Sequence, residues 1–206
     1  MLIIGAKGLA KELLEVCKLS NKLKSLVFYD NINTNDNFLY DEFPILNDDA
    51  SVINYFKTID KRFVLGFGDI IHRVKLAEQF INLGGEFTSL LSPEANISTF
   101  DVSIGEGVVI MPGAVVSNGV SIGKGCLVYF NASITHDVSI GSHSIISPGA
   151  TLLGRCKIGN QCFVGANATI LPDIVIGDNV VIGAGAVVTK NIENNTKVAG
   201  IPARDL

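Results

Sequence analysis

The chain has 206 residues, of which 48% are hydrophobic, 17% charged and 7% aromatic, and its formal net charge is −4. This length provides enough apolar material for one large domain or two small ones. Because the chain has no surplus of basic residues, it lacks the electrostatic basis for binding nucleic acid.

The sequence supports neither secretion nor insertion in a membrane. The opening residues, MLIIGAKGLAKEL, lack the basic segment, the longer apolar run and the cleavage site of a secretory signal. No uninterrupted apolar stretch approaches the ~20 residues of a membrane helix. Four cysteines without a CxxC pair do not form a disulfide framework. We therefore expect a cytoplasmic protein that is not inserted in a membrane.

The composition changes near residue 90. Residues 1–90 contain 22 charged residues and 6 glycines, whereas residues 91–206 contain 14 charged residues and 15 glycines. A shift of this size predicts two domains of different architecture, over 1–90 and 91–206.

In the first domain, short apolar runs over 2–4, 26–29 and 63–65 predict strands. Helical spacing over 9–16 predicts a first helix, and a stripe of Ile70, Val74, Ala77 and Phe80 predicts another. The polar stretch 32–36 between them predicts a loop. Strands that alternate with helices predict a small Rossmann-like α/β domain with a parallel sheet.

The turns that end the three strands are the candidate binding residues of this domain. They share one edge of the predicted sheet, where ligands of open α/β sheets gather, and they comprise Gly5, Ala6, Lys7, Gly8, Asp30, Asn31, Gly66, Phe67 and Gly68. The glycine turn at a helix start suits a phosphate, although a tight turn without a ligand remains an alternative. Phe67 either stacks on a base or packs against the protein. NAD is disfavoured because the glycine spacing differs from the dinucleotide fingerprint.

The second domain repeats every six residues. Each sixth residue from Ile104 to Val188 is a branched aliphatic, fifteen in all, and Ile-Gly pairs recur every eighteen residues. The position two residues earlier is small or β-branched. This period fits neither an α-helix nor a hairpin; it predicts a parallel β-helix whose triangular coils have three six-residue sides with the aliphatic inward. The period does not fix the hand, and parallel crossovers are usually right-handed.

Four motifs follow one another along the chain: the N-terminal Gly-Ala-Lys-Gly turn, the six-residue repeats, His136-Asp137 within them, and the closing Val-Ala-Gly-Ile-Pro-Ala segment. This order resembles the hexapeptide-repeat acyltransferases, in particular the bacterial enzymes that acetylate nucleotide-linked amino sugars or sialic acid during surface-polysaccharide and glycan synthesis. The resemblance implies a left-handed β-helix over 91–206, a homotrimer, acetyl-CoA as co-substrate without a metal, and a nucleotide-sugar acceptor bound by 1–90.

The chain has three histidines, and their surroundings separate them. His72 lies on a predicted surface helix, and His143 is either a solvated corner residue or an accessory polar group. His136 lies near a coil edge beside a carboxylate, where an unperturbed histidine suits proton removal from an attacking group. The resemblance makes His136 the general base and Asp137 its acidic partner.

For the acetyl donor, the resemblance implies a groove between subunits with Gly154, Ala166 and Ala184 as contacts and the Gly154 amide facing the thioester oxygen. Lys190 either meets a phosphate or is solvated. Three cysteines, Cys126, Cys156 and Cys162, occupy the small-residue register, and Cys17 falls in the first helix. We therefore expect direct transfer rather than an acyl-enzyme.

Three departures from the family pattern concern the acceptor: Leu9, Tyr129 and Ile145 stand where relatives often have histidine, asparagine and histidine. The leading hypothesis is N-acetylation of a 4-amino-4,6-dideoxy sugar linked to UDP, dTDP or GDP. The alternatives are O-acetylation of sialic acid or another sugar hydroxyl, and a non-enzymatic β-helix scaffold. A zinc enzyme of this fold needs three histidines on the coils, which carry only His136 and His143.

Overall fold

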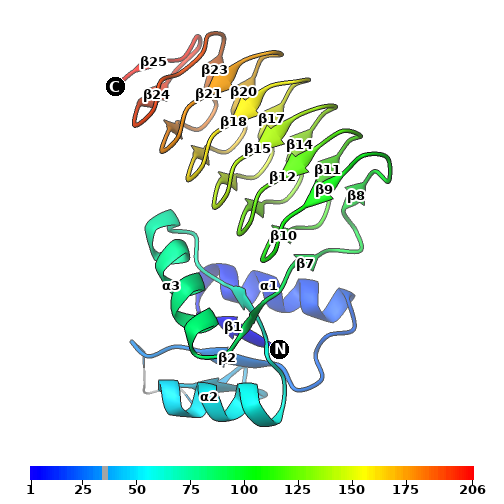
Figure 1. The fold of residues 1–206 in the computed structure, drawn as a ribbon, viewed down its shortest axis with the longest axis vertical. Coiled ribbons are helices and arrows are strands. Elements are labelled where there is room, and N and C mark those ends of the chain that lie inside the picture. The colour runs from blue at the N-terminus through cyan, green and yellow to red at the C-terminus, as the bar shows by residue number, and fades with distance from the viewer. Residues whose placement is uncertain (34–36) are drawn as a thin grey trace. The chain divides into compact units, whose positions relative to one another are not determined.

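A computed structural model describes residues 1–33 and 37–206 of the chain, which divide into two compact units, Met1–Leu90 and Leu91–Leu206 (Figure 1). The loop predicted over 32–36 includes residues 34–36, which lie outside the described residues. Within the described ranges, each helix is too short or too polar to cross a membrane.

The first unit contains a six-stranded sheet with the order β3-β4-β2-β1-β5-β6. Its strands are β1 (Leu2–Ile4), β2 (Val27–Tyr29), β3 (Phe38–Leu39), β4 (Phe43–Leu46), β5 (Arg62–Leu65) and β6 (Glu86–Phe87). The central strand β1 runs parallel to β2 and to β5, with Leu2 opposite both Val27 and Phe63. Among the strands that the structure describes in this sheet, only the edge strand β3 pairs antiparallel, so the predicted parallel sheet is confirmed and extended by an edge hairpin.

Three helices cover this sheet: α1 (Gly8–Leu19), α2 (Asp49–Thr58) and α3 (Ile70–Asn82). Side chains of α2 and α3 pack on one face around Phe63, whose ring stacks on Phe87 at a centroid distance of 5.1 Å. The buried side chains of α1 belong to the opposite face, where Ile3 and Val64 are fully buried. Helix α2 begins at an Asp48 cap that accepts a hydrogen bond from the Ser51 amide, 2.8 Å away.

The buried stripe of α3 differs from the one predicted. Ala77 and Phe80 are buried, but Ile70 and Val74 are only half-buried. The third fully buried position is Arg73, whose Nη1 donates to the carbonyl oxygens of Phe67 (2.7 Å) and Leu65 (3.3 Å). A buried arginine is tolerated because carbonyl oxygens replace the water that its guanidinium loses.

The second unit is a parallel β-helix with three sheets. The first contains β7 (Leu90–Leu91), β10 (Val109–Ile110), β13 (Leu127–Val128), β16 (Ile145–Ile146), β19 (Phe163–Val164), β22 (Val181–Ile182), β24 (Lys197–Ala199) and β25 (Arg204–Asp205). The second contains β8 (Asn96–Ile97), β11 (Val115–Val116), β14 (Ser133–Ile134), β17 (Thr151–Leu152), β20 (Thr169–Ile170) and β23 (Val187–Val188). The third contains β9 (Ser103–Ile104), β12 (Ser121–Ile122), β15 (Ser139–Ile140), β18 (Lys157–Ile158) and β21 (Val175–Ile176).

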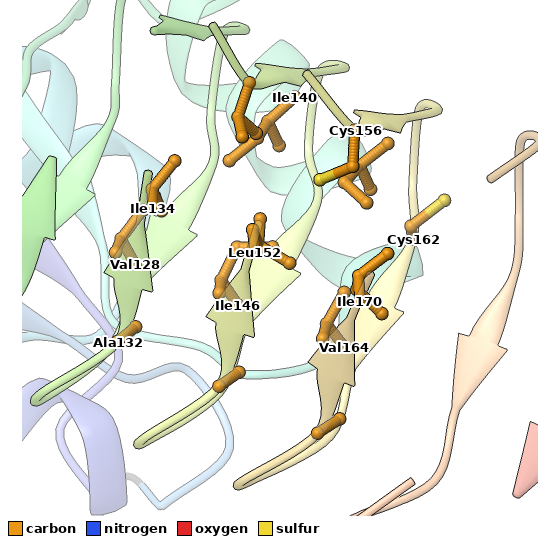
Figure 2. Close-up of a cluster of buried hydrophobic side chains, with 14 of the residues drawn as sticks. Val128, Ala132, Ile134, Ile140, Ile146, Leu152, Cys156, Cys162, Val164 and Ile170 are labelled. Atoms are coloured by element: carbon orange, nitrogen blue, oxygen red, sulfur yellow. The ribbon is translucent and has the colours of Figure 1, made fainter. Parts of the chain in front are cut away.

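The six-residue register forms the core of the β-helix, as predicted. Strands eighteen residues apart pair in register, for example Ile134 with Leu152 and Leu152 with Ile170. Of the fifteen aliphatics, fourteen are buried, and Ile104 is half-buried against the same core. Figure 2 shows two rows that run from coil to coil, one of Val128, Ile146 and Val164 and one of Ile134, Leu152 and Ile170. Each inward residue therefore packs on the equivalent residue of the next coil.

Candidate active site

His136 occupies a corner of the β-helix, two residues after the buried Ile134 of β14. The corner is tied to the next coil by two bonds: the Thr135 hydroxyl donates to the Leu152 carbonyl, and the Arg155 amide donates to the His136 carbonyl, both over 3.0 Å. With the backbone fixed in this way, the imidazole projects from the core and keeps 54% of its side-chain surface exposed.

Asp137 holds one nitrogen of this ring. Its Oδ2 lies 2.9 Å from Nδ1 of His136. Asp137 has a φ of 60°, a left-handed conformation that aspartate tolerates better than most residues. Because a carboxylate only accepts hydrogen bonds, the proton of the neutral imidazole belongs on Nδ1, and Nε2 carries the free lone pair.

Gly154 lies beside the other edge of the ring, one coil further on. It is buried, and a Cβ added there would lie 2.5 Å from Cε1 and 2.6 Å from Nε2 of His136. The imidazole therefore occupies the space that any larger residue would fill. Together the two neighbours orient a half-exposed ring whose Nε2 faces away from Asp137 and is suited to accepting a proton.

The remaining predicted donor residues lie elsewhere on the β-helix. Ala166 and Ala184 are eighteen residues apart at a different corner, after β19 and β22, and are half-buried and exposed respectively. Lys190 is exposed on the corner that follows β23, thirty-six residues beyond Gly154. The structure thus brings His136, Asp137 and Gly154 together, and it leaves Ala166 and Ala184 apart from them.

The other two histidines have different surroundings. His72 is exposed in the first turn of α3, where Asp69 contacts its Nδ1 at 2.8 Å and accepts from its amide. His143 is half-buried at another corner, and its ring covers Gly125 of the preceding coil. Across residues 1–33 and 37–206, no three metal-ligating side chains cluster closely enough to hold a metal ion.

All four cysteines are free and buried, as the packing interpretation predicted. Burial raises the pKa of Cys17 and of Cys156 to about 12. The Cys126 and Cys162 thiols lie 3.0 Å from the carbonyl oxygens of Gly141 and Gly177.

The first unit contains a cavity of about 250 Å³ of its own at the carboxyl edge of its sheet. Eight of the nine predicted binding residues line it; Asn31 is exposed and does not. Two further lining residues, Ile32 and Asn33, were not predicted, whereas the third, Leu9, is one of the departures from the family pattern noted for the acceptor.

The hydrogen bonds of Asp30 explain why Ile32 and Asn33 line the cavity and Asn31 does not. Its Oδ1 accepts from the amides of Ile32 and Asn33, and its Oδ2 accepts from the Asn33 side chain, each over 2.9 Å. Burial alone would raise the pKa of Asp30, but the bonds from Asn33 and Ile32 outweigh it and hold that pKa below its usual value. The carboxylate thus folds the loop back on itself, which turns Ile32 and Asn33 toward the cavity.

The opposite wall of the cavity comes from the glycine turn. The N-cap residue of α1 is Lys7, whose side chain does not cap the helix amides, and the first amides of a helix have no partner within the helix. Across from them, a Cβ on Gly5 would lie 3.1 Å from the Phe67 ring. An open helix start beside an aromatic ring can accommodate an anion and a flat ring system.

Comparison with known proteins finds a family for each unit. Residues 1–80 match the PglD N-terminal domain family, and residues 101–136, 119–154 and 155–190 match the bacterial transferase hexapeptide (six repeats) family. No significant match was found among curated protein sequences.

Solved structures of acetyltransferases resemble the whole chain. The acetyltransferase domain of PglB from Neisseria gonorrhoeae FA1090, also solved with acetyl coenzyme A, shares 29% identity at a TM-score of 0.91, over 100% of this chain and 98% of that one. A variant of perosamine N-acetyltransferase from Caulobacter crescentus, in complex with CoA and GDP-perosamine, shares 25% identity at a TM-score of 0.93, over 100% and 95%.

The β-helix is accordingly left-handed, against the usual preference of parallel crossovers. The stacked coils of six-residue repeats carry the predicted His136 at a corner, and the α/β unit matches the PglD N-terminal domain family. The chain belongs to the hexapeptide-repeat acetyltransferases with a PglD-type N-terminal domain.

Proposed function

We propose that the protein transfers the acetyl group of acetyl-CoA to the amino group of a nucleotide-linked amino sugar of the 4-amino-4,6-dideoxy type. The observation that carries the proposal is the 2.9 Å contact between Asp137 and Nδ1 of His136, which leaves Nε2 as a base at an exposed corner. The similarity to perosamine N-acetyltransferase supports the substrate class. Surface-polysaccharide or glycan synthesis uses sugars of this kind.

In the proposed reaction, the neutral amine nitrogen attacks the thioester carbonyl carbon and Nε2 of His136 takes the proton that the nitrogen loses. The tetrahedral intermediate then collapses, the carbon–sulfur bond breaks, and the imidazolium returns its proton to the leaving thiolate. The products are the amide and free CoA. Asp137 stabilises the imidazolium through Nδ1, and general-base assistance of this kind contributes ~10²–10⁴-fold.

The donor is proposed to lie with its thioester oxygen toward the Gly154 amide, a backbone donor that would stabilise the developing oxyanion. Ala166 and Ala184 would leave the backbone open to the pantetheine arm, and Lys190 would meet a phosphate. Because Ala166 and Ala184 occupy a different corner of the β-helix from Gly154 and Lys190, a groove between neighbouring subunits of a homotrimer would unite them. Because the cysteines are buried, they support direct transfer rather than an acyl-enzyme. Their free thiols agree with a location in the cytoplasm.

The acceptor's nucleotide is proposed to bind in the cavity of the first unit. The α1 start, from Gly5 to Gly8, suits the diphosphate because helix N-termini favour anions. Phe67 supplies a flat apolar surface for the nucleobase of the acceptor.

A substrate panel tests the proposal. UDP-, dTDP- and GDP-linked 4-amino-4,6-dideoxy sugars and free sialic acid are each incubated with acetyl-CoA, and CoA release is measured with the product mass. Alkaline hydroxylamine then distinguishes products, because it cleaves O-acetyl esters and leaves amides intact. We expect a hydroxylamine-resistant acetylated nucleotide sugar. An ester product would favour the sugar O-acetyltransferase, and absence of transfer together with absence of CoA binding would favour the scaffold.

A further inference from the structure

Three charged residues stack beside the His136 imidazole. Asp137, Arg155 and Asp173 are eighteen residues apart, share left-handed backbone conformations (φ of 60°, 63° and 64°), and occupy the same corner of successive coils. Their amides donate to the carbonyls of Asn118, His136 and Gly154 over 3.0–3.1 Å. Neighbouring parallel strands lie ~4.8 Å apart, so Arg155 has a carboxylate one coil before it and another one coil after it.

Arg155 pairs with only one of these carboxylates in the structure. Its Nε lies 2.7 Å from Oδ1 of Asp173 and its Nη2 lies 2.8 Å from Oδ2, a bidentate arrangement. Asp137 instead contacts Nδ1 of His136 at 2.9 Å. The corner therefore contains two separate couples, one acid with the arginine and the other acid with the histidine.

The two couples are electrostatically connected. Asp173 raises the pKa of Arg155, and Asp137 adds a smaller contribution in the same direction. Arg155 lowers the pKa of Asp173, with a smaller contribution from His136. Arg155 is therefore close enough to Asp137 to interact with it, although its guanidinium is paired with Asp173.

A guanidinium that loses a bidentate partner can pair with another carboxylate within reach. Without Asp173, the neighbouring carboxylate for Arg155 is Asp137. That new pair would withdraw Asp137 from Nδ1 and place a positive charge next to a ring that has to accept a proton. We propose that Asp173 is a positioning residue that holds Arg155 away from Asp137 and thereby preserves the His136–Asp137 pair. The inference rests on the proposed role of His136 as the base.

The test compares Asp173→Ala, Arg155→Ala and the double variant with the wild-type protein in the acetyl-transfer assay. We expect Asp173→Ala to lower kcat about tenfold, a part of the ~10²–10⁴-fold contribution of a general base, with the KM of each substrate unchanged within about twofold. Removing the displaced guanidinium as well should restore kcat to the value of Arg155→Ala, which we expect near that of the wild type.

The rescue separates this role from a structural one. Because Arg155 and Asp173 are 53% and 63% exposed, their pairing contributes little to stability, and all variants should fold, as checked by circular dichroism. A wild-type kcat for Asp173→Ala, or a double variant as slow as the single one, would overturn the inference. His136→Ala belongs in the same series: if it is slow while Asp173→Ala is normal, the inference alone fails, whereas a normal rate for His136→Ala removes the base as well.

Discussion

The His136 imidazole is held from two sides, by the Asp137 carboxylate and by the backbone of Gly154. The first neighbour is adjacent in sequence and was predictable from it. The second is eighteen residues away, and its apposition follows from the coil length, although the glycine's spatial role does not. The Arg155–Asp173 pair has the same eighteen-residue offset. The sequence did not indicate this pair, because the six-residue repeat marks inward residues and not the side chains that become neighbours on the outside of a corner.

The cysteines provide a test of direct transfer. A thiol with a raised pKa is protonated and unreactive near neutral pH, and all four here are buried. We predict that iodoacetamide at about pH 8 leaves the native protein unmodified and active, whereas denatured protein takes up four adducts, as counted by mass spectrometry. Rapid labelling of one native cysteine with loss of activity would instead support an acyl-enzyme.

Asp60 provides a pH-dependent contribution to stability. Its carboxylate accepts from Arg62 at 2.8 and 3.0 Å and from the α-amine of Met1 at 2.9 Å. Burial alone would raise the pKa of Asp60, but these bonds outweigh burial and hold the pKa well below its usual range. A carboxylate of this kind adds stability that is present at neutral pH and is lost as the pH falls through its folded-state pKa.

We therefore predict that Asp60→Asn lowers the free energy of unfolding by about 1–3 kcal/mol at neutral pH. The difference from the wild type should be smaller at about pH 3, because the charge-dependent stabilisation declines as the pH falls from the unfolded-state pKa of ~3.9 toward the lower folded-state pKa. Urea denaturation at the two pH values measures it, with the exposed Asp205→Asn as the control. An equal difference at both pH values would show that the stabilisation does not depend on the charge.

At the scale of elements, regular periodicity was predictive and short mixed segments were not. The fifteen aliphatics of the six-residue register defined the coils because each one faces the same core. Helix α2 was missed although Val52, Tyr55 and Phe56 have helical spacing, because only three buried residues mark it. Strand β4 was missed because it contains Pro44, a residue that argues against an inner strand, yet β4 lies between β3 and β2. On α3, Arg73 is buried and the predicted Val74 is only half-buried, because the Arg73 guanidinium binds the carbonyls of Leu65 and Phe67.

The stacked core makes a prediction about one coil. Leu152 is fully buried between Ile134 and Ile170, whereas Thr151 precedes it on the outward face of the same strand. We predict that Leu152→Ala lowers the free energy of unfolding by about 2–5 kcal/mol, through lost burial and the cavity it leaves. Thr151→Ala should change it by less than ~0.5 kcal/mol. Urea denaturation of both variants checks this, and equal effects would contradict the inward assignment of the register.

At the scale of the molecule, the composition change near residue 90 reflects two architectures with different requirements. The α/β unit exposes charged helix faces, whereas the β-helix buries two residues in most of its six-residue repeats and turns its corners mostly with glycine, asparagine and aspartate. The sequence was sufficient to predict both architectures and eight of the nine cavity-lining candidates. It could not predict that Asn31 faces outward, because that depends on how Asp30 folds its own loop.

The most direct test of the catalytic account is the kcat of His136→Ala with acetyl-CoA and the acceptor that the substrate panel identifies. The matched control is His72→Ala, which removes an exposed imidazole from α3. We predict that His136→Ala lowers kcat by at least ~10²-fold with little change in the KM for acetyl-CoA, and that His72→Ala leaves kcat unchanged. A His136→Ala variant that turns over at the wild-type rate would contradict the assignment of this imidazole as the base.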